Sequence, residues 1–315
     1  MGTMRTLMVT AIAVAWLDAS TALADDLVKM TIGQRGNWDT SITHLGDKAG
    51  IFKKHGLQLE MVYTSGSGET LQPVIAGQVD LGLAVGAMAA YAKGAPVRII
   101  GAQATGAADY WYAKNPEIKT LKDTNGHTIA FSTNGSSTNS VVRAFIDEFK
   151  LTAKPQATGN PSATLTAVMT DQVDVGWASP PFGLKEMEEG KIHLVARATD
   201  AALVRGQTIR VLVANADAIA KRKEVLDRFM KAYFESIEYM YSSDPEVIKN
   251  YAEFVKVTEP MAKRVRDEFF PKALVNPDQI HGLDSLIAEA VNLKFIPAPL
   301  TKEQVAELIR ISPRQ

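Results

Sequence analysis

Apolar and polar positions alternate in short regular blocks along the first part of the chain. Residues 29–34 alternate with a period of two, as a half-buried strand does, and residues 41–55 repeat apolar positions at helical spacing. A strand over 57–63, a helix over 69–76 and a short apolar strand over 81–85 follow. This alternation of strands and helices predicts a mostly parallel sheet with helices on both faces.

Part of this pattern returns later in the chain. Residues 78–82, Gln-Val-Asp-Leu-Gly, reappear as residues 172–176, Gln-Val-Asp-Val-Gly, and the flanking positions align without a gap. Two copies predict two related lobes, and ligands bind beyond the carboxyl ends of strands in such sheets, so we expect one cleft between the lobes. Asp80 and Asp174 precede the strand in each copy. We therefore expect them to stabilise turns rather than to touch the ligand.

The chain is expected to cross between the lobes twice. A Gly- and Ala-rich stretch, 103–108, precedes the aromatic run 110–112, and residues 127–197 then repeat the order of strand, polar loop and helix. Residues 201–208 would carry the chain back, and residues 209–214 are apolar enough to rejoin the first sheet. Two crossings make a hinge between the lobes.

From Asp217 onward the pattern is helical. Thr301, with Gln304 three positions later, forms a capping box at a helix start, and apolar residues between 225 and 240 recur at helical spacing. We expect these helices to pack on the first lobe and cover its flank. The predicted boundaries are 1–24 for an export signal, 25–104 and 207–315 for lobe 1, and 105–206 for lobe 2.

The N-terminus has the form of a cleaved export signal. Arg5 is followed by an apolar run over 7–17 and by the small-residue site Ala22-Leu23-Ala24. The apolar run is too short to remain as a membrane anchor. The chain has no cysteine, which excludes disulfides, thiol chemistry and a lipid anchor on cysteine. We therefore expect a mature protein beginning near Asp25 and free in the periplasm.

Charge and motifs narrow the function to the binding of a small molecule. The 34 Lys and Arg residues balance 35 Asp and Glu residues, which does not favour nucleic acid as a partner. The five histidines show no paired metal-ligand spacing, and there is no phosphate loop, nucleophile elbow or zinc signature. The sequence predicts a binding protein rather than an enzyme, with no metal, cofactor or catalytic residues.

Polar loops between a strand and a helix supply the candidate contacts. Residues 132–137 precede a helix, where free N–H groups and the helix dipole favour an anion, and residues 64–68 offer the equivalent place in the first lobe. Either loop alone is more typical of ordinary turns and caps, and it is the pair in equivalent positions that indicates a ligand site. Arg35 could pair with a carboxylate or sulfonate, and Trp38 could cover an apolar body. Replacing both with Ala is expected to abolish binding and leave stability nearly intact.

The residues predicted to contact the ligand come from these loops and from the ends of the two repeats. They are Gln34, Arg35, Asn37, Trp38, Ser65, Gly66, Gly86, Ser132, Asn134, Ser136, Ser137, Asn160, Trp177 and Ser179. Large aromatic residues are usually core, so some of these rings could be structural instead.

Several strings resemble one group of known proteins. Residues 49–57 (Ala-Gly-Ile-Phe-Lys-Lys-His-Gly-Leu), 75–80, 92–94 and 177–180 are similar to the nitrate, sulfonate and taurine group of periplasmic substrate-binding proteins, which serve ATP-binding-cassette (ABC) importers. The resemblance spans about residues 31–197. It implies the two-lobed type II periplasmic binding protein fold, with a mostly parallel sheet flanked by helices in each lobe. It also implies a monomer that closes on one ligand and docks on a membrane permease.

The leading hypothesis is a receptor that captures a small organic anion, such as a sulfonate, a taurine-like molecule or an aromatic or aliphatic carboxylate, and delivers it to the permease. The same superfamily includes binders of pyrimidine precursors of thiamine and related biosynthetic enzymes. Those proteins carry a cysteine-rich motif that this chain lacks, which weakens that alternative. A sensor domain that presents its ligand to a membrane kinase would share the fold and stays open.

Overall fold

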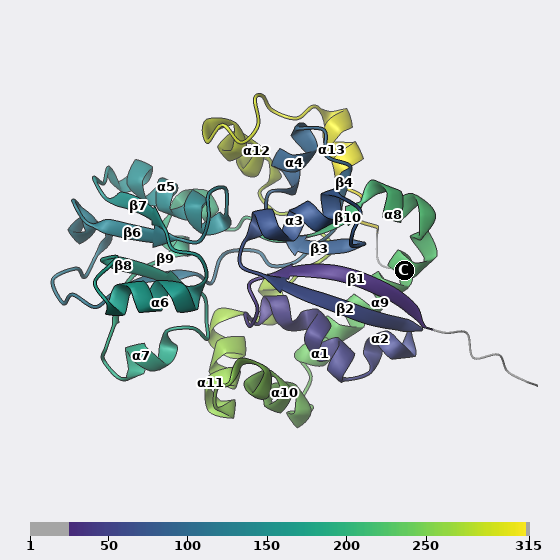
Figure 1. The fold of residues 1–315 in the computed structure, drawn as a ribbon, viewed down its shortest axis with the longest axis horizontal. Helices are drawn as coiled ribbons and strands as arrows, with labels where there is room; N and C mark the ends of the chain where they lie inside the picture. Colours follow the sequence, from purple (N-terminus) through teal and green to yellow (C-terminus); the bar gives the residue numbers. More distant parts are fainter. Residues whose placement is uncertain (1–24, 313–315) are drawn as a thin grey trace, which may run out of the picture.

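The computed structural model describes residues 25–312, so the predicted export signal lies outside the described residues. The chain forms two α/β lobes, each built around a sheet of five strands (Figure 1). The strands of the first sheet are β1 (Asp26–Gly33), β2 (Leu57–Thr64), β3 (Leu81–Ala84), β4 (Val97–Ala102) and β10 (Val211–Asn215). Those of the second are β5 (Tyr110–Ala113), β6 (Thr128–Phe131), β7 (Lys154–Ala157), β8 (Val175–Ala178) and β9 (His193–Arg197).

The two sheets have the same topology. Their strand orders are β2-β1-β3-β10-β4 and β7-β6-β8-β5-β9. In each sheet the fourth strand in this order has just crossed from the other lobe, and it runs antiparallel to both neighbours. The other four strands share one direction, which confirms the mostly parallel sheets predicted from the sequence. The repeated sequence is explained as well, because each copy leads into the central strand, β3 or β8.

Helices follow the strands as expected, with one difference. The helix predicted over 41–55 is divided into a 3-10 turn over Asp39–Ser41, α1 (Ile42–Lys48) and α2 (Ile51–Lys54). Gly50 causes the break, because its φ of 75° lies in the left-handed region that glycine adopts without steric cost. The other helices of the two lobes are α3 (Ser67–Ile75), α4 (Ala87–Ala92), α5 (Ser137–Phe149), α6 (Pro161–Met169) and α7 (Leu184–Glu188).

The Asp of each repeat holds a turn together. The Asp80 carboxylate accepts the backbone N–H of Lys29 at 3.0 Å and a guanidinium N–H of Arg222 at 2.6 Å. The Asp174 carboxylate accepts both the backbone N–H and the hydroxyl of Thr128, at 2.8 and 2.7 Å. Both acids thus tie the amino end of a central strand to the neighbouring strand, which agrees with a structural role.

The C-terminal part of the chain is helical and covers the first lobe. The long helix α9 packs on α1, α2 and β2, and α13 packs on β4. Among residues 25–312, no helix combines the length and apolar character that a bilayer crossing requires. The helices of this part are α8 (Ala216–Lys221), α9 (Lys223–Met240), α10 (Pro245–Val255), α11 (Glu259–Arg264), α12 (Leu283–Asn292) and α13 (Lys302–Leu308).

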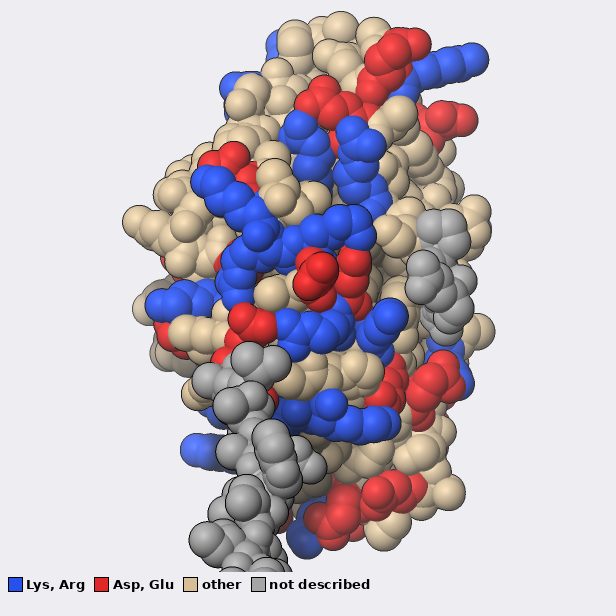
Figure 2. Space-filling view, turned by 90° about the vertical axis from the view of Figure 1, so that its right-hand side faces the viewer, with Lys and Arg blue, Asp and Glu red and all other residues tan. Residues whose placement is uncertain are grey.

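The far end of the first lobe carries mixed charge. Lys and Arg side chains gather in a band across this face, with Asp and Glu side chains between them (Figure 2). The first lobe also has exposed ion pairs, such as Lys223 with Asp227 and Lys54 with Glu235. This surface therefore does not present a single-sign field of the kind that attracts a polyanion.

Candidate ligand-binding site

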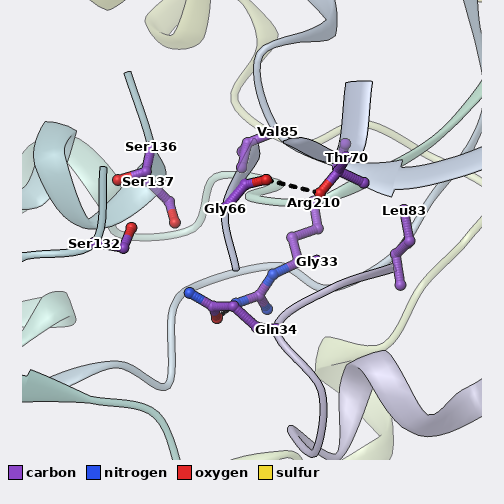
Figure 3. A pocket seen from close by; sticks show the side chains of 11 residues that line it. Gly33, Gln34, Gly66, Thr70, Leu83, Val85, Ser132, Ser136, Ser137 and Arg210 are labelled. Atoms are coloured by element: carbon purple, nitrogen blue, oxygen red, sulfur yellow. Dashed lines mark hydrogen bonds between the residues drawn. The ribbon is translucent and has the colours of Figure 1, made fainter. Parts of the chain in front are cut away.

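A narrow cavity lies between the two lobes, and we call it the inner cavity (Figure 3). Its volume is about 20 Å³, which is space for one water-sized group. The first lobe contributes the ends of β1 and β3 and the start of α3, and the second lobe contributes the loop before α5. The lining residues are Gly33, Gln34, Gly66, Thr70, Leu83, Ala84, Val85, Ser132, Ser136, Ser137 and Arg210.

Two helix N-termini face this cavity from opposite lobes. Ser136 caps α5, and its hydroxyl accepts the N–H of Asn139 at 3.2 Å. On the other side, Gly66 precedes α3, and its carbonyl accepts the hydroxyl of Thr70 at 2.9 Å (Figure 3). A Cβ on Gly66 would lie 2.8 Å from the Thr133 hydroxyl, so the absence of a side chain lets the lobes approach each other here. Both helix dipoles favour an anion between the lobes.

Arg210 brings a positive charge to the same place. It lies just before β10, on the second crossing, and only 8 % of the residue is exposed. Its guanidinium donates one N–H to the Asp39 carboxylate and another to the side-chain carbonyl of Gln34, the latter at 2.9 Å. Gln34 itself has a φ of 59°, a costly conformation for a residue other than glycine. Strained backbone of this kind is common at functional sites.

A second carboxyl group lies beside the Arg210–Asp39 pair. Asp109 is 2 % exposed, and it precedes β5 on the first crossing. Burial raises the pKa of Asp109 to about 6; attraction to Arg210 and a hydrogen bond from Ser179 oppose the rise, and repulsion from Asp39 adds to it. Among the described residues, one carboxyl oxygen (Oδ1) of Asp39 and one of Asp109 have no hydrogen-bond partner. The buried cluster thus has two carboxyl groups for one guanidinium.

A larger space adjoins the inner cavity, and we call it the outer cavity. It has a volume of about 120 Å³ and shares Val85, Ser136 and Ser137 with the inner cavity. Helices α4, α5 and α12 form its walls together with the second crossing. The apolar residues Met88, Ile209, Leu286 and Phe295 line it beside the polar residues Ser140, Gln207, Thr208 and Glu289.

Two polar side chains of the outer cavity are unusual. Gln207 is 2 % exposed, yet neither its amide nitrogen nor its amide oxygen has a hydrogen-bond partner among the described residues. Burial raises the pKa of Glu289, and a hydrogen bond with Ser140 opposes that rise. Glu289 on α12 and Ser140 on α5 thus meet across the outer cavity. Unsatisfied buried amides are rare in native proteins and are usually paired with water or a ligand.

The structure brings together about half of the predicted contact residues. Gln34, Gly66, Ser132, Ser136 and Ser137 line the inner cavity, and Gly86 lines the outer one. Two further predicted residues do not line a cavity but lie next to residues of the site. Asn37 donates to the Gln34 side-chain carbonyl at 3.1 Å, and Ser179 lies near the Asp109 carboxyl group and lowers its pKa.

The structure does not bring the aromatic residues to either cavity. Trp38 is fully buried; its indole N–H donates to the Tyr241 hydroxyl at 3.0 Å, and its ring lies 4.7 Å from that of Tyr251. Trp177 is likewise fully buried, in the middle of the second sheet. The rings pack in the core because burying their large apolar surface is favourable.

Four polar residues of the predicted set also lie elsewhere. The Arg35 side chain is directed over the Phe254 ring, with the guanidinium carbon 4.5 Å from the ring centroid, and Asn134 is exposed. Ser65 gives its backbone N–H to Glu69, and the Asn160 side chain caps α6 by accepting the N–H of Ala163. The Asn160 side chain and the Ser65 backbone thus serve local helix structure, which was the alternative explanation for such loops.

Sequence reasoning missed Arg210, Asp39, Asp109 and Gln207. A signal for Arg210 was present, because a cation stands directly before the apolar strand residues 211–214, and charged residues rarely enter a core without a partner. Gln207 lies in the same crossing segment. No local pattern marks either Asp, since each is one of many acids in polar loops.

Two α/β lobes of identical topology, joined by two crossings around a polar cavity, define the two-lobed binding-protein architecture. The model of the NMT1/THI5-like family matches residues 37–247, and the chain belongs to this family. This confirms the resemblance that was stated from the sequence.

Several proteins that this chain resembles in sequence or structure are named as binding proteins. A Brucella abortus protein named as a binding protein is 26 % identical over 261 residues, covering 80 % of this chain and 79 % of its own. The alkanesulfonate-binding protein SsuA of Xanthomonas axonopodis pv. citri bound to MOPS has a TM-score of 0.75 at 15 % identity, over 92 % of this chain and 100 % of its own. The periplasmic nitrate-binding protein NrtA of Synechocystis PCC 6803 has a TM-score of 0.71 at 13 % identity, over 91 % and 87 %.

Proposed function

We propose that this protein is a periplasmic receptor that captures a small organic anion between its lobes and delivers it to an ABC importer. One observation carries the proposal: a buried arginine, Arg210, lines a cavity that lies between the N-termini of two helices from opposite lobes. Charge-assisted hydrogen bonds from arginine and the positive ends of helices suit a sulfonate or carboxylate. Two structural neighbours are named as alkanesulfonate-binding and nitrate-binding proteins, which supports an anionic ligand.

The two cavities suggest how such a ligand would lie. The inner cavity has space for one oxygen of the anionic group, next to Arg210 and the serine hydroxyls. The outer cavity would hold the body of the ligand against Met88 and Phe295, and the free amide of Gln207 would pair with a polar atom of that body. This arrangement favours a sulfonate, a taurine-like molecule or an aromatic or aliphatic carboxylate over a bare inorganic anion.

Closure of the lobes would follow from the hinge. The two crossings run side by side, with Gly106 N–H donating to the Gln207 carbonyl at 2.7 Å and Ile209 N–H donating to the Ala104 carbonyl at 3.1 Å. Lobe 1 (25–104 and 207–315) would rotate against lobe 2 (105–206) about these two crossing segments. A ligand that contacts both lobes shifts the population towards the closed form. The closed monomer, with no cofactor, would then dock on the permease.

A thermal-shift screen of residues 25–315 tests this function. The panel contains ethanesulfonate, taurine, benzoate, nitrate and simple pyrimidines. A ligand at a hundred times its dissociation constant stabilises the folded state by about 2.7 kcal/mol, so we expect a rise of several degrees for a sulfonate or a carboxylate. A shift for pyrimidines alone would instead support the thiamine-precursor alternative, and no shift with any anion would contradict the proposal.

A further inference from the structure

The charge balance of the buried cluster is the starting point, and the inference rests on the proposed anion receptor. Asp39, Asp109 and Arg210 carry a net charge of −1 when both carboxyl groups are ionised. Asp39 is completely buried, Asp109 is 2 % exposed and Arg210 is 8 % exposed, so solvent screens these charges poorly. An anion in the inner cavity would add a second uncompensated negative charge next to Arg210. Such a site needs a further positive charge before it can bind an anion well.

The two carboxyl groups differ in how firmly they are held. Asp39 pairs directly with the Arg210 guanidinium, and its backbone carbonyl also accepts the side-chain amide of Gln103. Asp109 forms no ion pair within 4.0 Å among the described residues; the Ser179 side chain lies near its carboxyl group, and its Oδ1 is unpaired. Asp109 is therefore the carboxyl group that can take a proton while the Arg210–Asp39 pair stays intact.

The groups that act on the Asp109 carboxyl come from three different segments of the chain. The charged groups that act on its carboxyl are Arg210 before β10 and Asp39 after β1, and the Ser179 hydroxyl approaches it from the end of β8. Asp109 precedes β5 on the first crossing and Arg210 ends the second, so the two charges that act on each other lie on different crossing segments. A change of charge on Asp109 is thus felt by the arginine that would hold the ligand.

We infer that Asp109 is a proton-binding site linked to the ligand site, so that the cleft binds an anion together with one proton. The bound anion compensates part of the positive charge of Arg210 and repels the Asp109 carboxylate. Both effects favour the protonated form of Asp109. Protonation leaves the cluster of Asp39, Asp109 and Arg210 electrically neutral. The bound anion then carries the only uncompensated negative charge of the site and lies between two helix N-termini.

The pH dependence of binding follows from this linkage. In the free protein, Asp109 has a pKa of about 6, so most molecules carry the carboxylate at pH 7.5. The bound anion raises that pKa further, and binding takes up a proton in the window between the free and bound values. Affinity for a ligand that stays fully ionised therefore increases as the pH falls towards about 6, by up to tenfold per pH unit, and levels off below that value.

Isothermal titration calorimetry at pH 7.5 tests the linkage, with the strongest sulfonate or carboxylate from the thermal-shift panel. Phosphate and Tris buffers differ in their heats of ionisation, so the difference in binding heat gives the protons taken up. We expect uptake that approaches one proton per ligand for the wild-type protein and for Asp147→Asn, in which an exposed carboxylate of α5 is removed. Asp109→Asn should show no uptake and an affinity that is independent of pH.

The outcomes separate this inference from the proposed function. Tight anion binding with equal heats in the two buffers, or equal uptake in Asp109→Asn, would overturn the proton site and leave the receptor in place. No binding of any panel anion would overturn both. If Asp109→Asn fails to fold, carbon NMR of wild-type protein labelled at the Asp carboxyl groups decides, because the group that titrates near pH 6 must move to higher pH on addition of ligand.

Discussion

Replacing Arg210 with Met is expected to lower ligand affinity by at least about a hundredfold. Among the described residues that line the inner cavity, Arg210 is the one cation, and its guanidinium is fixed by Asp39 and Gln34. A hydrogen bond to a charged group contributes about 1.5–3 kcal/mol, so loss of two such bonds to the ligand removes about 3 kcal/mol or more. Calorimetric titration with the panel ligand measures the change directly.

Controls separate this loss from a loss of folding. Arg205→Met removes an exposed arginine of the same crossing segment and should leave affinity unchanged. Arg210→Met leaves the buried Asp39 unpaired, which destabilises the protein, so the double variant Asp39→Asn with Arg210→Met should regain thermal stability without regaining binding. Arg210→Lys keeps the charge but cannot hold two partners in one plane, and we expect intermediate affinity. Near-normal binding by the double variant would place the ligand elsewhere.

Replacing Trp38 with Ala is expected to destabilise the protein by about 3–5 kcal/mol, the range found for the removal of large buried aromatic side chains. The ring packs edge-on against Tyr251 and Tyr241, and its N–H holds the Tyr241 hydroxyl, which in turn donates to the Phe270 carbonyl at 2.6 Å. Ala would leave a cavity at the junction of β1 with the C-terminal helices and would remove the N–H that the Tyr241 hydroxyl oxygen accepts. Urea unfolding followed by fluorescence or circular dichroism gives the change in unfolding free energy.

Arg35→Ala is the matched comparison from the same loop. Arg35 is exposed and stacks on Phe254, a contact of about 0.5–1 kcal/mol, so this variant should remain close to wild type in both stability and affinity. This reverses the expectation from the sequence, in which the two residues together formed the ligand contact. A Trp38→Ala protein of unchanged stability that no longer binds ligand would restore the earlier hypothesis.

The fold was predictable because its strongest determinants are local. The repeat before β3 and β8, the regular alternation of strands and helices and the apolar return strand give the two sheets almost completely. The strand β7 was missed, since Lys154–Ala157 is polar and contains Pro155, which is tolerated because β7 lies at the edge of its sheet. The division of the first helix at Gly50 also depends on backbone conformation rather than on apolar spacing.

The sequence predicted only residues of the site that are polar or glycine and also lie in a loop before a helix or at the start of the helix. Serines before a helix N-terminus, such as Ser132 and Ser136, line the cavity because the topology points that loop at the cleft. Aromatic residues were misplaced, since nothing in the sequence tells a ring in the core from a ring against a ligand. Arg210 and Glu289 reach the cavities from segments far along the chain, so only the assembled structure places them there.

The strands that follow the two crossings, β5 and β10, differ in how far along the chain their sheet partners lie, and this sets an order of folding. All strands of the second sheet lie within residues 110–197, whereas in the first sheet β10 must insert between β3 and β4 after the whole second lobe has been passed. The second sheet can therefore form from a continuous stretch of chain, and the first closes a longer loop and forms later. Pulse-labelled hydrogen exchange during refolding should protect β6 and β8 before β3 and β4, and simultaneous protection would contradict this order.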